Sequence, residues 1–199
     1  MPLVSMSRLL ADAASGGYAV CYCEAWNLES LRAVVQAAEV THSPIIAGFN
    51  GGFLMHPGRA MPEKLAYYAG VGMALHKATV PVAFLLNETD SIGQIEEGIG
   101  LGFNAVMVEN EHMPFDEYRR LVKRVVGIAH SQNVSVEAQL GRLPDASGHL
   151  TAEPTDPEAA RTFVMETGID ALGVAVGNAR TCGLVRSGSS ANSFRRSVA

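Results

Sequence analysis

Four glutamates and a histidine stand where their side chains could hold a metal ion. Glu88, Glu109, Glu111 and Glu137 lie near the carboxyl ends of predicted strands, with His112 beside them. Oxygen-rich sites favour magnesium or manganese over zinc, and a metal held there could stabilise an enolate. The competing interpretation treats these side chains as solvated loop carboxylates or as partners of helix caps. The residue types alone leave both interpretations open.

Polar side chains also follow most of the other predicted strands, at Glu24, Asn50, Asn87, Gln139 and Asn178. In a (β/α)8 barrel, residues at the carboxyl ends of many different strands build one active site. A doubly wound sheet concentrates its site at one switch point instead. The spread of polar residues over several strand ends therefore favours a barrel, although the general polarity of loops would give a similar pattern.

These positions depend on strands that alternate with amphipathic helices along the chain. Predicted strands begin near residues 18, 44, 81, 104, 134 and 171. The clearest helix covers residues 115–131, where apolar residues recur at helical spacing on one face. This alternation predicts right-handed βαβ units and a parallel sheet. A doubly wound sheet and a closed barrel both fit it.

The composition is that of a compact soluble protein. Of the 199 residues, 48% are apolar and 18% are charged, with a formal net charge of −5. The body of the chain carries no basic patch, which argues against nucleic acid as a partner. The longest apolar stretches are strand-sized, short of the roughly 20 residues that a membrane helix needs. Three cysteines, an odd and sparse set, predict a reducing cytoplasm as the location.

Five segments carry the motifs of one family in the same order along the chain. They are Leu85-Leu-Asn87-Glu88-Thr-Asp90-Ser91, Met107-Val-Glu109-Asn-Glu111-His112-Met-Pro114-Phe115, Val134-Ser-Val-Glu137-Ala-Gln139-Leu-Gly141, Thr155-Asp-Pro-Glu158 and Thr167-Gly-Ile-Asp170-Ala-Leu-Gly-Val-Ala-Val-Gly177. As a set they resemble the class II, metal-dependent ketose-bisphosphate aldolases, which include fructose- and tagatose-bisphosphate aldolases. The resemblance covers residues 1 to about 180. It implies a (β/α)8-type barrel, here with about six of the eight βα units.

The resemblance also implies a chemistry, namely retro-aldol cleavage of a phosphorylated ketose with a zinc ion as Lewis acid. The family's acid/base aspartate corresponds to Asn87, whose amide has no titratable proton near neutral pH. Of the three zinc histidines, the first corresponds to Glu88 and the second to Arg180, which stays protonated and cannot ligate. The third belongs to a His-Gly-Gly segment without a counterpart here, and a supporting glutamate corresponds to Gln139. We therefore expect that the usual zinc site does not form from this chain alone.

Three functions follow from the resemblance and the residues together. The first is a divergent class II aldolase, an aldehyde-lyase acting on a phosphorylated sugar in its complete form. The second is a non-catalytic barrel relative that serves binding or assembly, and the third is a magnesium-dependent lyase with a carboxylate site. The expected cofactor is a divalent metal (zinc in the family, magnesium or manganese here) or none. The candidate residues are Asn87 and Glu109 for catalysis, Glu88, Glu111, Glu137, Gln139 and Arg180 for a metal, and Asn50, His112 and Asn178 for substrate.

The end of the chain differs in composition from the rest. No acidic residue follows Asp170, and serine and arginine dominate the last residues. We expect residues 1–180 to form the partial barrel and residues 181–199 to form a disordered tail. Either a truncated or frame-shifted gene product or a short relative with a basic tail would explain this change. Six of eight strands would leave two open sheet edges, which predicts a homo-oligomer.

Overall fold

A computed structural model describes residues 3–56, 58–61, 63–109, 113–141 and 154–176. The chain divides into two compact units, one formed by Met1–Leu140 with Asp156–Gly173 and the other by Gly141–Thr155 with Val174–Ala199. In the described part of the second unit, the Thr155 amide donates to the Ala175 carbonyl at 2.9 Å, and the Ala175 amide donates to the Thr155 hydroxyl at 2.9 Å. The predicted tail, residues 181–199, lies outside the described residues.

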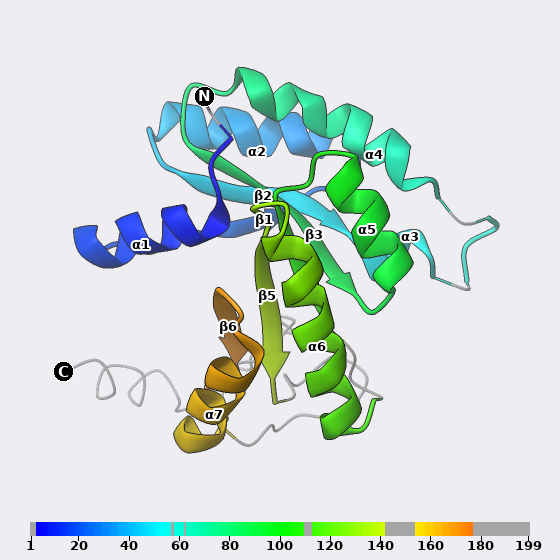
Figure 1. The fold of residues 1–199 in the computed structure, drawn as a ribbon. Helices are drawn as coiled ribbons and strands as arrows, with labels where there is room; N and C mark the ends of the chain where they lie inside the picture. The colour runs from blue at the N-terminus through cyan, green and yellow to red at the C-terminus, as the bar shows by residue number, and fades with distance from the viewer. Residues whose placement is uncertain (1–2, 57, 62, 110–112, 142–153, 177–199) are drawn as a thin grey trace, which may run out of the picture. The chain divides into compact units, whose positions relative to one another are not determined.

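Strands and helices alternate through the first unit (Figure 1). In chain order the elements are α1 (Met6–Gly16), β1 (Tyr22–Glu24), α2 (Leu28–Val40), β2 (Ile45–Asn50), α3 (Gly51–Leu54), α4 (Leu65–Gly72), the 3-10 helix η1 (Met73–Lys77), β3 (Val82–Thr89), α5 (Ile92–Gly100), β4 (Ala105–Val108), α6 (Phe115–His130), β5 (Ser135–Leu140), α7 (Pro157–Thr167) and β6 (Ala171–Val174). Side chains of Ser5, Asn27, Ser91 and Asp156 accept backbone hydrogen bonds at the first turns of α1, α2, α5 and α7.

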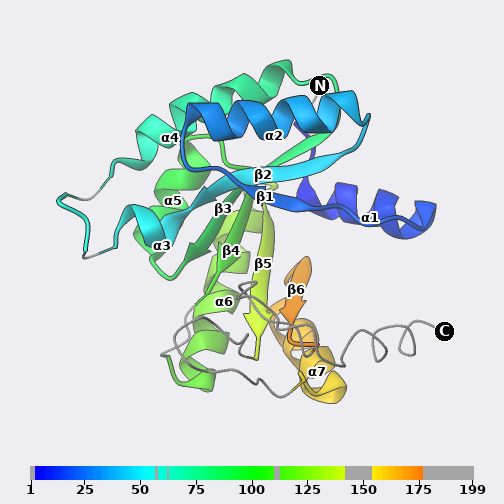
Figure 2. The ribbon, with the colours of Figure 1, turned by 180° about the vertical axis from the view of Figure 1, so that it is seen from behind.

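The order of the strands decides between the two folds that the sequence left open. The sheet has the order β1-β2-β3-β4-β5-β6, and the pairs from β1·β2 to β4·β5 are parallel. Figure 2 shows these strands following one another across the sheet. A doubly wound sheet would reverse its strand order at a switch point, whereas sequential parallel strands are the arrangement of a (β/α)8 barrel. The fold is therefore α/β with six parallel strands of an incomplete barrel.

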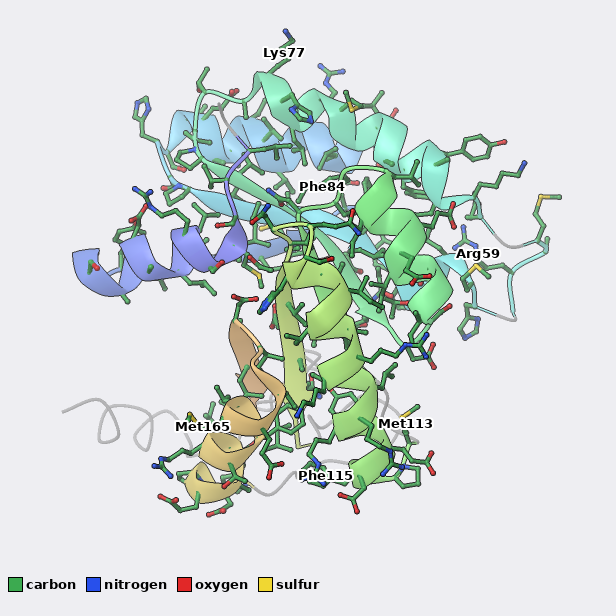
Figure 3. The ribbon with its side chains drawn as sticks, viewed as in Figure 1. Arg59, Lys77, Phe84, Met113, Phe115 and Met165 are labelled. Atoms are coloured by element: carbon green, nitrogen blue, oxygen red, sulfur yellow. The ribbon has the colours of Figure 1, made fainter. Side chains whose placement is uncertain are left out.

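One face of the sheet packs against helices and holds the main core. Phe84 on β3 lies in this core (Figure 3), where its ring stacks on Phe103 with centroids 4.0 Å apart and meets Phe49 edge to face. Val82 and Leu86 on the same strand are fully buried with it. Strands that are buried this deeply appear in a sequence as nearly continuous apolar runs. This is why β2, β3 and β4 could be predicted from the sequence.

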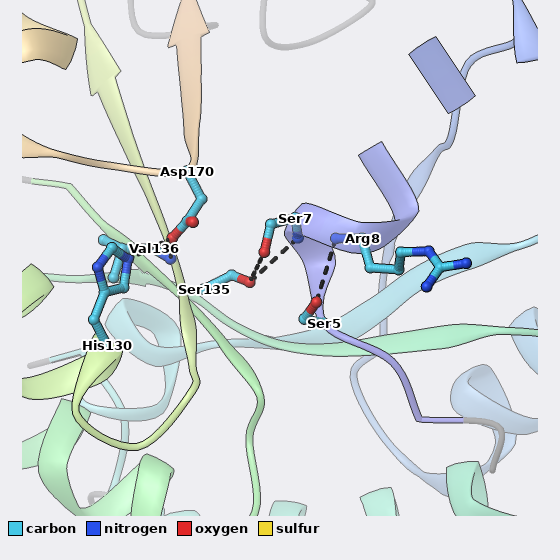
Figure 4. A network of polar contacts seen from close by, with 7 residues as sticks. All are labelled: Ser5, Ser7, Arg8, His130, Ser135, Val136 and Asp170. Atoms are coloured by element: carbon cyan, nitrogen blue, oxygen red, sulfur yellow. Dashed lines mark hydrogen bonds and ion pairs between the residues drawn. The ribbon is translucent and has the colours of Figure 1, made fainter. Parts of the chain in front are cut away.

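The other face of the sheet, here called the inner face, carries a separate apolar cluster. Ile46, Leu85 and Met107 contribute to it from three neighbouring strands, and Met6 and Leu9 of α1 cover it. A pair of serines also anchors α1, because the hydroxyls of Ser7 and Ser135 lie 2.9 Å apart (Figure 4).

The start of β6 is tied to β5 and α6 in the same region. One carboxylate oxygen of Asp170 accepts from the Val136 amide at 2.8 Å and meets Nε2 of His130 at 2.8 Å (Figure 4). These bonds hold the amino ends of the strands, opposite the end where the candidate residues lie.

Two helical segments lie between β2 and β3. The longer one, α4, begins at Leu65 and runs directly into the 3-10 helix η1. The shorter one, α3, follows β2 at once, and its first turn is capped by Asn50. An asparagine at a strand end thus overrides the loop preference of the two glycines that follow it.

Candidate active site

The strand register places most of the predicted polar residues on the inner face. Glu24 pairs with Gly48, and Asn50 pairs with Asn87. Met107, a member of the inner-face cluster, pairs with Glu137. Because side chains alternate along a strand, Gln139 lies on that face as well. Polar side chains of β1, β2, β3 and β5 therefore share one face at the carboxyl end of the sheet.

Glu88 joins this group through an irregular turn of the backbone. The pairing of β3 with β4 shifts register between Leu86 and Thr89, and Glu88 has a φ of 49°. That is the left-handed region, which residues other than glycine rarely adopt. The side chain of Asn50 donates to a carboxylate oxygen of Glu88 at 2.5 Å and accepts from the Phe53 amide at 3.0 Å. The bulge thus turns Glu88 toward the end of β2.

Asn87 forms a second pair of amide and carboxylate. Its side-chain nitrogen donates to Glu24 at 3.2 Å, and the hydroxyl of Tyr22 donates to the same carboxylate oxygen at 3.3 Å. Both Asn50 and Asn87 are buried. A primary amide can orient a hydroxyl or a carbonyl but cannot take up its proton near neutral pH. In this pair the group able to exchange a proton is Glu24.

Negative charge is concentrated on the inner face. The pKa of Tyr22 is raised far above its usual range by burial, then by the charge and hydrogen bond of Glu24, and then by Glu88 and Glu137. The pKa of Glu137 is also raised, first by burial and then by repulsion from Glu88. The charges of three carboxylates therefore all act to raise the pKa of one phenol.

Tyr118 of α6 holds β4 and β5 from the helix-covered face. Its hydroxyl donates to the Val108 carbonyl at 2.7 Å and accepts from the Gln139 amide at 3.0 Å. Burial raises its pKa to about 12 against the lowering effect of the Gln139 amide, with smaller contributions from Glu109 and Glu137. The buried phenol thus fixes the backbone from which Gln139 and Glu109 extend.

The described residues do not form a metal site by themselves. Within residues 3–109, 113–141 and 154–176, apart from residues 57 and 62, no three histidine, cysteine, aspartate or glutamate side chains come together as ligands. The predicted residues Glu111, His112, Asn178 and Arg180 lie outside the described part of the chain.

Two residues of this site received no role from the sequence. Glu24 was noted as a polar residue after a strand, and Tyr22 was not singled out. Alternation along the strand could have found Tyr22, because it lies two residues before Glu24 and so on the same face. The partner of Glu24, Asn87, is 63 residues away in sequence, and no local pattern indicates such a contact.

Comparison with known proteins identifies the family. A family model described as fructose-bisphosphate aldolase class-II matches residues 4–183. The chain belongs to this family. It is 36% identical over 186 residues to a fructose-bisphosphate aldolase of Staphylococcus aureus, covering 89% of this chain and 63% of that protein. The chain thus spans about 63% of the length of this aldolase, and the predicted resemblance to class II aldolases is confirmed.

Solved structures of aldolases share the fold. The crystal structure of the YdjI aldolase from Escherichia coli K12 is similar with a TM-score of 0.75 and 32% identity, covering 88% of this chain and 61% of that one. A fructose-bisphosphate aldolase from Campylobacter jejuni has a TM-score of 0.68 at 19% identity, covering 86% of this chain and 58% of that one, and shows the fold alone. The predicted barrel class is confirmed. Among the described helices, none is long and apolar enough to cross a membrane.

Proposed function

We propose that this chain supplies the sugar-binding inner face of a class II aldolase-type lyase that cleaves a phosphorylated ketose by a retro-aldol reaction. The observation that carries the proposal is the pairing of buried amides with carboxylates at the strand ends. Asn50 is bonded to Glu88 at 2.5 Å and Asn87 to Glu24 at 3.2 Å. Such pairs are suited to a polyhydroxylated ligand, because each retains further lone pairs and N–H groups for hydroxyls.

The negative charge of the inner face supports a divalent cation in the complete protein. The charge of Glu88 repels that of Glu137, and the carboxylates of this face would also repel a phosphate. A cation bound by Glu88, together with groups outside the described residues, would relieve both repulsions. Bound there, such an ion would supply Lewis-acid polarisation of the ketose carbonyl. We propose Glu88 as the described member of its ligand set, with Glu111 and His112 as further members.

The residues of the chain have separable tasks in this reaction. Asn87 would orient the hydroxyl whose carbon–carbon bond breaks, through its amide oxygen, because its nitrogen already donates to Glu24. The proton of that hydroxyl must go to a carboxylate, and Glu109 is our candidate for it. Asn50 would hold a neighbouring hydroxyl while it keeps Glu88 in place.

The test is an assay for triose phosphate released from fructose 1,6-bisphosphate and fructose 1-phosphate. It is run with added zinc, magnesium or manganese and again after treatment with a chelator. We expect metal-dependent cleavage that Glu88→Ala abolishes, together with binding of the metal. The matched control is Glu96→Ala, an exposed carboxylate on α5, which should leave cleavage unchanged. Cleavage that is indifferent to the chelator would refute the metal-dependent mechanism.

One observation favours a second candidate, a non-catalytic relative that binds the sugar without cleaving it. The family's acid/base position is an amide here, and Asn87 is held by Glu24. A protein of this kind would bind fructose 1-phosphate but release no triose phosphate with any of the three metals. Restoring the acid with Asn87→Asp would separate the two candidates, because it should increase cleavage in a weak lyase and leave a chain without a metal site inactive.

A further inference from the structure

A small cavity of about 100 Å³ lies at the carboxyl ends of β1 and β2, at the border of the main core. Aromatic rings supply much of its lining, from Trp26, Phe49, Phe53 and Tyr68. Asn50 also lines it, and the same side chain binds Glu88 of the candidate active site. The cavity and the candidate active site therefore share one residue, Asn50.

Two of the aromatic side chains present their rings to solvent. Trp26 is 57% exposed and Phe53 is 43% exposed, with ring centroids 5.1 Å apart at an interplanar angle of 44°. The other two rings, those of Phe49 and Tyr68, pack edge to face at 5.0 Å and belong to the core or its border. An exposed aromatic pair above a packed aromatic floor is a surface that an apolar ligand face would cover.

The polar rim of the cavity is electrically balanced. Arg59, which lies on the segment after α3 (Figure 3), donates to Glu63 at 2.8 Å and to the Phe53 carbonyl at 3.3 Å. The two charged side chains are each about one third exposed. A phosphate at this rim would have to compete with Glu63 for the guanidinium. Hydroxyl groups could instead accept from Arg59 and donate to Glu63 without breaking the pair.

We propose that this cavity is a subsite for the end of the substrate remote from the bond that is cleaved, and that it takes an uncharged hydroxylated carbon chain. The C–H faces of the chain would pack on Trp26 and Phe53, and its hydroxyls would bond to Arg59 and Glu63. This proposal rests on the proposed function, because the remote end of the substrate is defined by the bond that the retro-aldol reaction cleaves. It adds that the subsite selects the length and charge of the substrate.

The test compares three probes that differ only in that remote end. Dihydroxyacetone phosphate lacks it, fructose 1-phosphate has it uncharged, and fructose 1,6-bisphosphate has it phosphorylated. Affinities are measured by calorimetry with the wild type, Trp26→Ala, Phe53→Ala and the control Tyr67→Ala, a ring 64% exposed on α4 outside the cavity. Trp26 is the single tryptophan of the chain, so its fluorescence in the wild type reports directly on occupation of the cavity.

We expect Trp26→Ala and Phe53→Ala each to weaken fructose 1-phosphate by roughly five- to tenfold and to leave dihydroxyacetone phosphate unchanged. Tyr67→Ala should alter neither, and fructose 1-phosphate should shift the tryptophan emission. Fructose 1,6-bisphosphate should bind no tighter than fructose 1-phosphate to the wild type, and Glu63→Gln should improve its binding by freeing Arg59.

The outcomes separate this proposal from the proposed function. If the sugar phosphates bind but the aromatic substitutions change no affinity, the subsite is overturned and the proposed function stands. If the bisphosphate binds the wild type more than tenfold tighter than the monophosphate, the subsite holds a phosphate and the uncharged assignment is overturned. If no probe binds, both proposals fail.

Discussion

At the scale of single residues, the inner face is organised by amides that separate carboxylates. Asn50 and Asn87 each donate to one glutamate, and their burial leaves little room for water to replace them. Glu88 keeps a left-handed backbone conformation that is costly for a glutamate. Local strain of this kind persists where the surrounding structure determines it, and it is frequent at functional sites.

Replacing Asn50 should destabilise the protein, because its side chain accepts the hydrogen bond that caps α3 and donates a hydrogen bond to Glu88. We expect Asn50→Ala to lower the free energy of unfolding by about 1–3 kcal/mol, measured by denaturant titration. Asn50→Asp is the informative comparison. It keeps an acceptor for the Phe53 amide but places a second negative charge beside Glu88. A stability of Asn50→Asp equal to the wild type at neutral pH would contradict this account.

The ionisation of Glu137 should make the folded protein less stable as the pH rises. Because burial and Glu88 raise the pKa of Glu137 in the folded state, the folded state binds more protons than the unfolded state. Stability should therefore fall as pH rises from about 4.3, the value for an unfolded glutamate, through the higher folded pKa. We expect Glu137→Gln to remove this loss, so that its advantage over the wild type grows with pH.

The measurement for Glu137 is the free energy of unfolding at several pH values for the wild type and the variant. Glu96→Gln, an exposed carboxylate on α5, serves as the control and should follow the wild type. Parallel curves for the wild type and Glu137→Gln would show that this side chain carries no such penalty.

At the scale of elements, α4 packs closely against β3, the strand that carries Asn87 and Glu88 of the candidate site. A Cβ added at Gly72 would lie 2.2 Å from the ring of Phe84, whereas one added at Gly70 in the same helix would meet nothing within 4 Å. Phe84 in turn contacts Phe49 and Phe103. The position of α4 relative to β3 thus depends on a glycine that leaves space for a ring.

These two glycines provide a matched pair of substitutions. We expect Gly72→Ala to destabilise by about 1–3 kcal/mol through overpacking, and Gly70→Ala to stabilise by up to about 1 kcal/mol through helix propensity. Thermal unfolding followed by circular dichroism would measure both. A Gly72→Ala variant as stable as Gly70→Ala would mean that Phe84 moves aside freely.

The sequence predicted the elements better than the contacts between them. The strands predicted to begin near residues 81 and 104 are β3 and β4, and the helix predicted over residues 115–131 is α6. The polar residues at 87–89 were read as a loop because the apolar run ends at Leu86, yet they continue β3. The side chains of Asn87 and Glu88 are bonded to residues of β1 and β2, contacts that no local pattern reveals.

The candidate site shows the same limit. Alternation could place Glu137 and Gln139 on one face, but the bulge that turns Glu88 toward Asn50 depends on the β3–β4 pairing. The aromatic cavity joins Trp26 and Phe53, which lie far apart in sequence and on different elements. Long-range packing of this kind, not residue type, decides which polar groups meet.

At the scale of the whole molecule, α1 covers the apolar part of the inner face. Met6 is fully buried there with Leu9, against Ile46, Leu85 and Met107. We expect Met6→Ala to cost about 2–5 kcal/mol, the usual range for emptying a buried methionine site. Met165→Ala on α7, where the side chain is 76% exposed, should stay within about 0.5 kcal/mol of the wild type. Denaturant titration measures the free energy of unfolding of both variants. Equal losses of stability in Met6→Ala and Met165→Ala would show that α1 is not part of the core.

The attachment of α1 also has a consequence for how the chain is made. Val4, just before α1, is hydrogen-bonded to Val82 and Asn104, and Ser7 within the helix is bonded to Ser135, which is 128 residues away. A nascent chain emerges from its amino end at about 5–20 residues per second. Helix α1 therefore leaves the ribosome several seconds before β5 has been synthesised, and Met6 and Leu9 stay exposed during that interval. A chaperone that shields apolar segments during translation would find a target in Met6 and Leu9, the residues that later cover the inner face.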